Sequence, residues 1–345
     1  MPKGIFIGIG GTGVTTVSRL KALLFKRAYN CDKEAMDNDC TFIFYDTDAG
    51  AKDDALADSE LQMMMGRYPV IDQSTEYIDA GTTAPYNTYA DARNSRLSDA
   101  TKQRLLEWAI DPNVKGHFQM PQKQLSEGAG AQRMAGRTGI YCSIDDMEDK
   151  ILAGLQGMQK LAKQGHNLNV EHPAIWVFSS SNGGTSSSAL MDVLYLADRL
   201  YKANVANADP YLRLVLYMPK AFIDVNKDNA LTYGRNAYAT LWELNEFRAD
   251  LFQRNDGNKF GAFAVQPDKT DWKGRAPWGV CSYVMAVDTE SQSGNVSMRQ
   301  MYNNTAEMCY FLHTGAAGKS MISQTMHAGT SILLLILNIR SLYSK

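Results

Sequence analysis

A glycine-rich loop near the amino terminus has the composition of a phosphate-binding loop. The run Gly8-Ile9-Gly10-Gly11-Thr12-Gly13 follows an apolar segment and opens a helical pattern. In this context, backbone N–H groups and the helix dipole can hold a phosphate. The same letters also satisfy the dinucleotide fingerprint, so an NAD(P)-dependent oxidoreductase with a Rossmann fold is one interpretation of this loop alone.

Two further loops of similar character follow along the chain. They are Gly128-Ala129-Gly130-Ala131 and Ser179-Ser180-Ser181-Asn182-Gly183-Gly184-Thr185-Ser186. In a parallel sheet, the loops after successive strands emerge at the carboxyl edge, so all three loops can converge on one ligand. A dinucleotide fold needs one such loop, whereas three donor-rich loops suit a chain of phosphates. The sequence therefore predicts a nucleotide triphosphate, bound with Mg²⁺ as triphosphates usually are.

Alternating strands and helices position these loops. We expect apolar strands at residues 4–9, 41–45, 174–178, 212–218, 280–287 and 332–337. We expect helices at residues 14–25, 105–110, 143–163, 188–201, 229–252 and 296–313, and a further helix that begins near Met134 after the second loop. This order predicts an α/β fold with a doubly wound, mostly parallel sheet.

The three loops together resemble those of the tubulin and FtsZ superfamily, and specifically its bacterial tubulin-like proteins. Gly10-Gly11-Thr12-Gly13 is similar to the first phosphate loop of the family, and Gly128-Ala129-Gly130, with Gly136-Arg137 after it, to the loop over the γ-phosphate. The third loop has Asn182, Ser186 and Ser188 where the family signature has glycines. The resemblance covers roughly the first 250 residues. It implies that GTP or GDP is the nucleotide.

The resemblance also implies further nucleotide contacts. Asp46-Thr47-Asp48-Ala49 is similar to a family segment near the nucleotide, so Asp46 and Asp48 are candidate binding residues. In the family's central helix an aromatic ring stacks on guanine and an amide reads its edge, which implies Tyr233 and Asn236 here. In an oxidoreductase, Asp46 would hold the ribose of NAD. It lies 33 positions after Gly13, more than the usual ~20 from the motif, which disfavours that interpretation.

Filament assembly with coupled GTP hydrolysis is the function that the resemblance implies. In the family, an acid from a loop after the central helix reaches the nucleotide of the neighbouring subunit. The asparagine-x-aspartate signature of that loop is missing here, and the available acids are Glu243, Glu246, Asp250 and Asp256. Asp256 is our first candidate for the catalytic acid, because it lies in a turn, and Glu246 is the second. A nucleotide-gated binding module that does not polymerise is the alternative.

The length of 345 residues favours two domains. We expect a nucleotide-binding domain over residues 1–225, a connecting helix over residues 226–255, and a smaller α/β domain over residues 256–345, complete or truncated.

The amino-acid composition argues against several classes of binding partner. The chain has 35 basic and 37 acidic residues, so it has no positive excess to bind nucleic acid. Five scattered cysteines and five scattered histidines give no metal-ligand spacing. The amino terminus lacks a secretion signal, and the apolar run at residues 332–337 is too short to span a bilayer. We therefore expect a cytoplasmic protein whose partners are a guanine nucleotide and further copies of itself, as a homo-oligomer or filament.

Overall fold

A single parallel sheet forms the centre of the protein. The computed structural model describes residues 1–83, 125–163, 173–205, 212–248, 283–291 and 294–315. Six strands pair in the order β3-β2-β1-β4-β5-β6, and every pair is parallel. The strands are β1 (Gly4–Ile9), β2 (Cys40–Asp46), β3 (Tyr77–Asp79), β4 (Ala174–Ser180), β5 (Leu212–Tyr217) and β6 (Tyr283–Val287). This arrangement confirms the predicted fold class.

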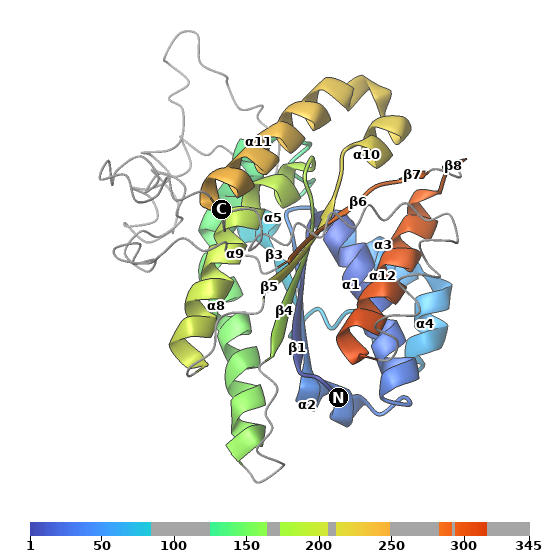
Figure 1. Cartoon of the computed structure of the whole chain (residues 1–345), viewed down its shortest axis with the longest axis vertical. Helices are drawn as coiled ribbons and strands as arrows, with labels where there is room; N and C mark the ends of the chain where they lie inside the picture. The colour runs from blue at the N-terminus through green and yellow to red at the C-terminus, as the bar shows by residue number, and fades with distance from the viewer. Residues whose placement is uncertain (84–124, 164–172, 206–211, 249–282, 292–293, 316–345) are drawn as a thin grey trace, which may run out of the picture.

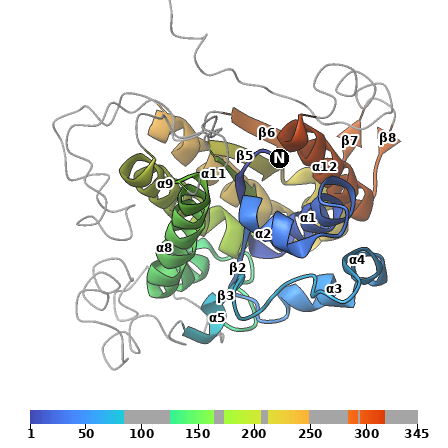
Figure 2. The same cartoon turned by 90° about the horizontal axis from the view of Figure 1, so that it is seen from below.

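Helices cover both faces of the sheet, which gives three layers (Figure 1). One layer contains α8 (Arg133–Lys163) and α9 (Gly184–Asn204), which pack on each other. The opposite layer contains α1 (Gly10–Leu23) and α12 (Met298–Thr314), also in mutual contact. The view from below shows these pairs on the two sides of the strands (Figure 2). The remaining helices are α2 (Lys33–Asp39), α3 (Ala51–Ala57), α4 (Ser59–Met65), α5 (Ala80–Thr83), α10 (Lys220–Val225) and α11 (Ala230–Arg248).

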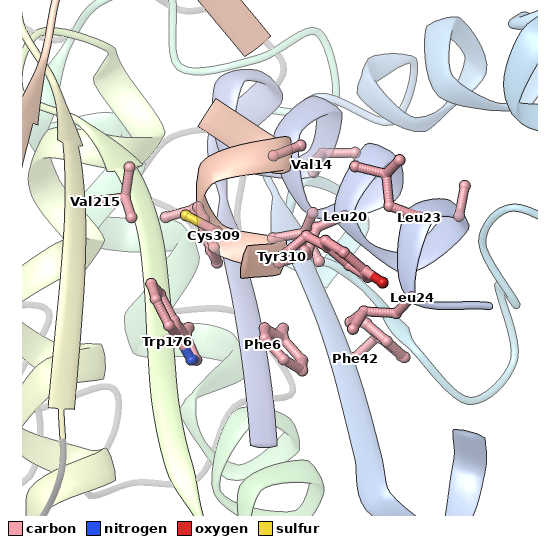
Figure 3. Packing of buried hydrophobic residues seen from close by; sticks show 14 of the residues in the cluster. Phe6, Val14, Leu20, Leu23, Leu24, Phe42, Trp176, Val215, Cys309 and Tyr310 are labelled. Carbon is pink, nitrogen blue, oxygen red and sulfur yellow. The ribbon is translucent and has the colours of Figure 1, made fainter. Parts of the chain in front are cut away.

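The central strands are apolar on both faces because each face packs on helices. In β1, Ile5, Ile7 and Ile9 belong to the core under α8 and α9, and Phe6 belongs to the core under α1 and α12. Figure 3 shows the second core, in which Phe6, Trp176 and Tyr310 lie between strands and helices. Alternating side chains along one strand thus stabilise both layers.

Two of the helices that follow the glycine-rich loops begin earlier than the sequence predicts. α1 begins at Gly10 instead of residue 14, and α9 begins at Gly184 instead of residue 188. The helix expected to begin near Met134 is confirmed, since α8 begins at Arg133 and continues across a kink at Ser143. Glycine and serine have weak helix propensity, so a pattern of apolar residues leaves out these first turns. The consequence is that part of the first loop and part of the third loop form helix N-termini.

The segment after β5 returns to the same sheet. α11 lies between β5 and β6 in the sequence, and these two strands are parallel neighbours. α11 is therefore part of the β5–β6 crossover, and it lies with α10 at the carboxyl edge of the sheet (Figure 1). The described residues after 256 contribute β6 to the sheet and α12 to a covering layer. A separate smaller domain over residues 256–345 stays a prediction.

Several predicted elements lie outside the described residues. They are the helix at 105–110, the turn that contains Asp256 and the strand at 332–337. Within the described ranges, no helix combines the length and the apolar character that crossing a membrane requires.

Candidate functional site

The first loop contains glycines with two different roles. A Cβ atom on Gly13 would lie 2.4 Å from the carbonyl oxygen of Phe178, so Gly13 allows α1 to pack closely on β4. Gly10 has a φ of +72°, which glycine adopts without strain. Gly11 is exposed, and the nearest atom to a Cβ there would be Oδ2 of Asp46, at 3.8 Å. Of these three glycines, only Gly11 has room for a Cβ atom without a close contact or backbone strain, and we call the room beside it the open space at Gly11.

Asp46 lies beside this open space at the carboxyl end of β2. Its carboxylate accepts the backbone N–H groups of Thr47 at 2.7 Å and Asp48 at 3.2 Å. The hydroxyls of Thr47 and Thr185 are 2.5 Å apart, which connects this segment to the third loop. Burial raises the pKa of Asp46 to about 7, even though these hydrogen bonds favour the carboxylate. The protein therefore holds a carboxyl group there that is partly protonated near neutral pH.

The raised pKa of Asp46 predicts that the nucleotide-free protein loses stability as pH rises from about 4 to about 7. The folded pKa of about 7 lies above the ordinary value of 3.8, so the folded state keeps a proton that the unfolded state releases. We expect Asp46→Asn to remove this part of the pH dependence. Urea unfolding of both proteins at pH 5 and pH 8 measures their free energies of unfolding. An equal change in this free energy with pH in the two proteins would contradict the prediction.

The second loop adopts backbone conformations that are unusual outside glycine. Gly128, Gly130 and Ala131 have φ values of +85°, +54° and +62°. A positive φ is energetically unfavourable for a residue that has a Cβ atom. The strain at Ala131 therefore marks a loop whose shape the surrounding structure imposes. The backbone N–H of Ala49 donates to the carbonyl of Ser126 at 3.0 Å, which joins this loop to the segment after β2.

The third loop packs against both of the others. A Cβ on Gly184 would lie 2.7 Å from Cβ of Ala129, and a Cβ on Gly10 would lie 3.0 Å from Cβ of Ser186. The Ser186 hydroxyl is 2.6 Å from that of Ser180, so this departure from the family's glycine pattern stabilises the loop. The three loops thus converge at one edge of the sheet, as predicted from the parallel order.

Helix N-termini supply the hydrogen-bond donors of the site. The N-cap residues of α1 and α9 are Ile9 and Gly183. Neither residue forms a side-chain hydrogen bond that caps its helix. The N–H groups of a first helical turn have no partner within the helix, so these two N-termini can donate to a ligand. Asn182 is 1% exposed, and its side-chain oxygen has no hydrogen-bond partner in the described part of the chain. The site therefore fits an anionic group that also carries donors, such as a phosphate with a hydrated cation.

Asn236, predicted to read the base, connects two of the loops. Its Nδ2 donates to the carbonyl of Ala131 at 2.7 Å and to that of Asn182 at 2.9 Å. Tyr233 is half-buried one turn earlier on α11. Both amide hydrogens of Asn236 are thus bonded within the protein, and its Oδ1 is the atom left to accept a hydrogen bond from a base.

Thr240 and Arg133 of this region were not predicted, and Glu243 was predicted in another role. Thr240 donates to the carbonyl of Ser181 at 3.0 Å, and Glu243 forms an ion pair with Arg133. Glu243 had been considered only as an acid for catalysis, and its ion pair gives it a structural role. The spacing of Asn236, Thr240 and Glu243 places them on one helix face, which is the sequence signal that would have identified them.

The predicted catalytic acids are not part of this arrangement. Asp256 lies outside the described residues, and the side chain of Glu246 lies outside them as well, although its backbone belongs to α11. The predicted phosphate-loop residues and Asp46 come together at the carboxyl edge. Asp48 lies at the edge of the same site, where a Cβ on Gly128 would be 3.3 Å from Cβ of Asp48.

Comparison with known proteins gives one family match. A family model described as "Tubulin like" matches residues 5–328 of the chain. Among solved structures, the chain is similar to CetZ from Methanosaeta thermophila strain DSM 6194, with 13% sequence identity and a TM-score of 0.41. That similarity covers 98% of this chain and 60% of the CetZ chain, so the chain spans about three fifths of its length. No curated protein sequence matches the chain.

Proposed function

The chain belongs to the tubulin-like family, and we propose that it binds GTP with Mg²⁺ between its three glycine-rich loops and assembles head to tail. The observation that supports the triphosphate most directly is the open space at Gly11, between the N-terminus of α1 and the buried Asp46. The N-termini of α1 and α9, which have no side-chain caps, lie at this edge of the sheet. Phosphate oxygens are the acceptors that such donors suit.

A divalent cation would offset the negative charges that a triphosphate and the carboxylate of Asp46 bring together at this site. A triphosphate next to the carboxylate of Asp46 places like charges together, which a proton or a cation must offset. Asp46 and Asn182 present oxygens that would accept hydrogen bonds from the waters of a hydrated Mg²⁺. When bound, Mg²⁺ supplies neutralising charge for phosphoryl transfer. The chain's own contribution is to hold the phosphates and to shield them from bulk water.

We expect the protein to bind GTP at least about tenfold more tightly than ATP, because phosphate contacts are the same for both and one or two hydrogen bonds to guanine distinguish them. Asn236→Ala should weaken GTP binding more than ATP binding and so narrow this difference. Calorimetric titrations with GTP, ATP and NAD in the presence of Mg²⁺ measure the affinities.

Three outcomes of these titrations would revise the proposal. Equal affinity of the unmodified protein for GTP and ATP would remove the guanine assignment. Tighter binding of NAD than of either triphosphate would favour the oxidoreductase instead. An equal loss of GTP and ATP affinity in Asn236→Ala would leave Asn236 only its observed role of connecting the two loops.

Hydrolysis should depend on protein concentration. Phosphoryl transfer needs an aligned water, and we propose that Asp256, or else Glu246, aligns it at the nucleotide of a neighbouring copy. Isolated molecules should then hydrolyse GTP negligibly, and turnover per molecule should rise as assembly begins. Phosphate release and light scattering, measured over a range of protein concentrations with Asp256→Ala as control, test this. A constant rate per molecule without scattering would leave a nucleotide-binding module that does not polymerise.

A further inference from the structure

Tyr217, the last residue of β5, is a tyrosine whose hydroxyl lies in an apolar core. Its side chain is 0% exposed and belongs to the core between the sheet and the helices α1 and α12. Burying a hydroxyl costs free energy unless hydrogen bonds replace those to water, and a phenylalanine would fill nearly the same volume without that cost. The hydrogen bonds of Tyr217 therefore indicate what its hydroxyl contributes.

The hydroxyl of Tyr217 is attached to the start of α1, which belongs to the first loop. Oη of Tyr217 and Oγ1 of Thr16 are 2.7 Å apart. Thr16 gives its single hydrogen to the carbonyl of Thr12, at 2.9 Å, so Tyr217 is the donor to Thr16. The hydroxyl of Thr305 on α12 is a second partner of Tyr217. Burial raises the pKa of Tyr217, so the hydroxyl keeps the hydrogen that it donates.

The main-chain carbonyl of Tyr217 is attached to the third loop. It accepts the backbone N–H of Ser181 at 2.9 Å and the hydroxyl of Ser181 at 3.0 Å. Ser181 is followed by Asn182 and by Gly183, the N-cap of α9. Tyr217 is thus hydrogen-bonded to the first loop through its side chain and to the third loop through its main chain.

The contact between the first and third loops limits their movement in one direction only. A Cβ on Gly10 would lie 3.0 Å from Cβ of Ser186, so the loops cannot come much closer, but this contact alone does not stop them from moving apart. Tyr217 opposes such separation, because it attaches both loops to β5, which pairs with β4 on one side and with β6 on the other. The N-termini of α1 and α9 are thereby held at one separation.

We infer that Tyr217 is a positioning residue of the nucleotide site, which fixes the first and third loops at the separation at which both bind the phosphates of one triphosphate. This inference rests on the proposed function, because the phosphates are those of the proposed GTP. Tyr217 is fully buried, so it acts through Thr16 and Ser181 and has no contact with the ligand. Hydrogen bonds weaken steeply when their geometry is lost, so a shift of one loop relative to the other lowers affinity.

Tyr217→Phe separates the two attachments, because it removes the hydroxyl and leaves the carbonyl. In the nucleotide-free protein, hydrogen exchange should become about fivefold faster or more at the amides of residues 10–16, which lose this attachment, and stay unchanged at residues 179–186. A general loss of stability would instead accelerate exchange throughout the sheet and its helices. In calorimetric titrations with Mg²⁺, the affinity of the variant for GTP should fall by about fivefold or more, the effect of one hydrogen bond.

Substitutions at Thr16 test whether the two hydroxyls act as a pair. Thr16→Val removes the acceptor of the Tyr217 hydrogen and should also lower the affinity for GTP. Thr16→Ser keeps a hydroxyl at this position and should keep most of the affinity. Tyr217→Phe should have little further effect in a protein that already carries Thr16→Val, because the same chain of hydrogen bonds is already broken. Additive losses in the double variant would contradict the pairing.

Tyr201→Phe is the matched control. Tyr201 of α9 is also 0% exposed, and within the described ranges its hydroxyl has no hydrogen-bond partner. The same substitution there should leave both the exchange of residues 10–16 and the affinity for GTP unchanged. An equal loss of affinity in Tyr201→Phe and Tyr217→Phe would overturn the specific role of Tyr217.

The two measurements distinguish failure of this inference from failure of the proposed function. Full GTP affinity in a folded Tyr217→Phe protein overturns the positioning role and leaves the proposed function standing. Absence of GTP binding by the unmodified protein overturns the proposed function instead, and hydrogen exchange then decides alone. Faster exchange confined to residues 10–16 retains Tyr217 as the residue that fixes the first loop, whereas exchange that is unchanged, or faster everywhere, overturns it.

Discussion

Gly11→Val should lower the affinity for GTP by at least about 100-fold and leave the folded protein as stable as before. A Cβ at Gly11 would make an ordinary van der Waals contact with Asp46 Oδ2 at 3.8 Å and no closer contact, so the nucleotide-free fold has room for it. The same side chain would stand between the phosphates and the N-terminus of α1. Loss of one or two hydrogen bonds to a charged group, each worth about 1.5–3 kcal/mol, gives an effect of this size. Calorimetric titration with GTP and thermal unfolding measure the two quantities.

Two other glycines provide the controls for Gly11→Val. Gly157 in α8 also faces open space, but on the solvent side of that helix, so Gly157→Val should leave both binding and stability nearly unchanged. Gly13→Val should instead destabilise the fold by about 3 kcal/mol or more, because its Cβ would lie 2.4 Å from the carbonyl oxygen of Phe178. Full GTP affinity in a stable Gly11→Val protein would show that the first loop does not contact the phosphates.

Lys21→Met should destabilise the protein by about 3–5 kcal/mol, the typical cost of removing one partner of a buried ion pair. Lys21 of α1 is 1% exposed, and its Nζ lies 2.7 Å from both carboxylate oxygens of Glu76, just before β3. Burial lowers the pKa of Lys21, and Glu76 opposes that change. Without the lysine, the carboxylate of Glu76 stays buried with no cation to offset its charge. Urea unfolding measures the change in free energy.

An exposed ion pair of the same type is the control for Lys21→Met. Lys33 and Asp37 form a pair at i and i+4 on α2, largely in solvent, so Lys33→Met should cost less than about 1 kcal/mol. The double variant Lys21→Met/Glu76→Gln removes both buried charges and should recover most of the stability that the single variant loses. An equal cost for Lys21→Met and Lys33→Met would mean that the buried pair has no special role in joining α1 to the edge of the sheet.

The third loop has other residues where the family signature has glycines, and sequence comparison alone does not show whether these residues weaken or stiffen the loop. Asn182, Ser186 and Ser188 stand at these positions. In the structure, the Ser186 hydroxyl contacts that of Ser180, and the Ser188 hydroxyl donates to the carbonyl of Gly184 at 2.7 Å. The family's glycines would leave the backbone flexible at these positions, whereas the serines here form hydrogen bonds within the loop. Whether a substitution weakens or stiffens a loop depends on such hydrogen-bond partners, which the residue types alone do not identify.

The sequence by itself determined the strands β1, β2, β4, β5 and β6, the order of the loops and the edge at which they meet, but not the short edge strand β3. Runs of apolar residues such as those in β1 and β4 specify strands buried on both faces, and such strands pair in parallel when helices alternate with them. Parallel pairing directs every loop after a strand to the carboxyl edge. These are local patterns combined with one general rule of topology, so the convergence of Gly10, Asn182 and their neighbours follows from the sequence.

Only the tertiary structure decided which residue of each pattern contacts which partner. Gly11 and Gly13 are the same residue type two positions apart, yet one faces open space and the other touches β4, because α1 turns between them. The sequence predicts α11 as a connecting helix, and only the pairing of β6 with β5 shows that this helix lies within a crossover of one sheet. The sequence predicts Asn236 as a base-reading amide, and only the structure shows that its Nδ2 also donates to the carbonyls of Ala131 and Asn182. Each of these outcomes depends on contacts between segments far apart in the sequence, whose energies no local pattern encodes.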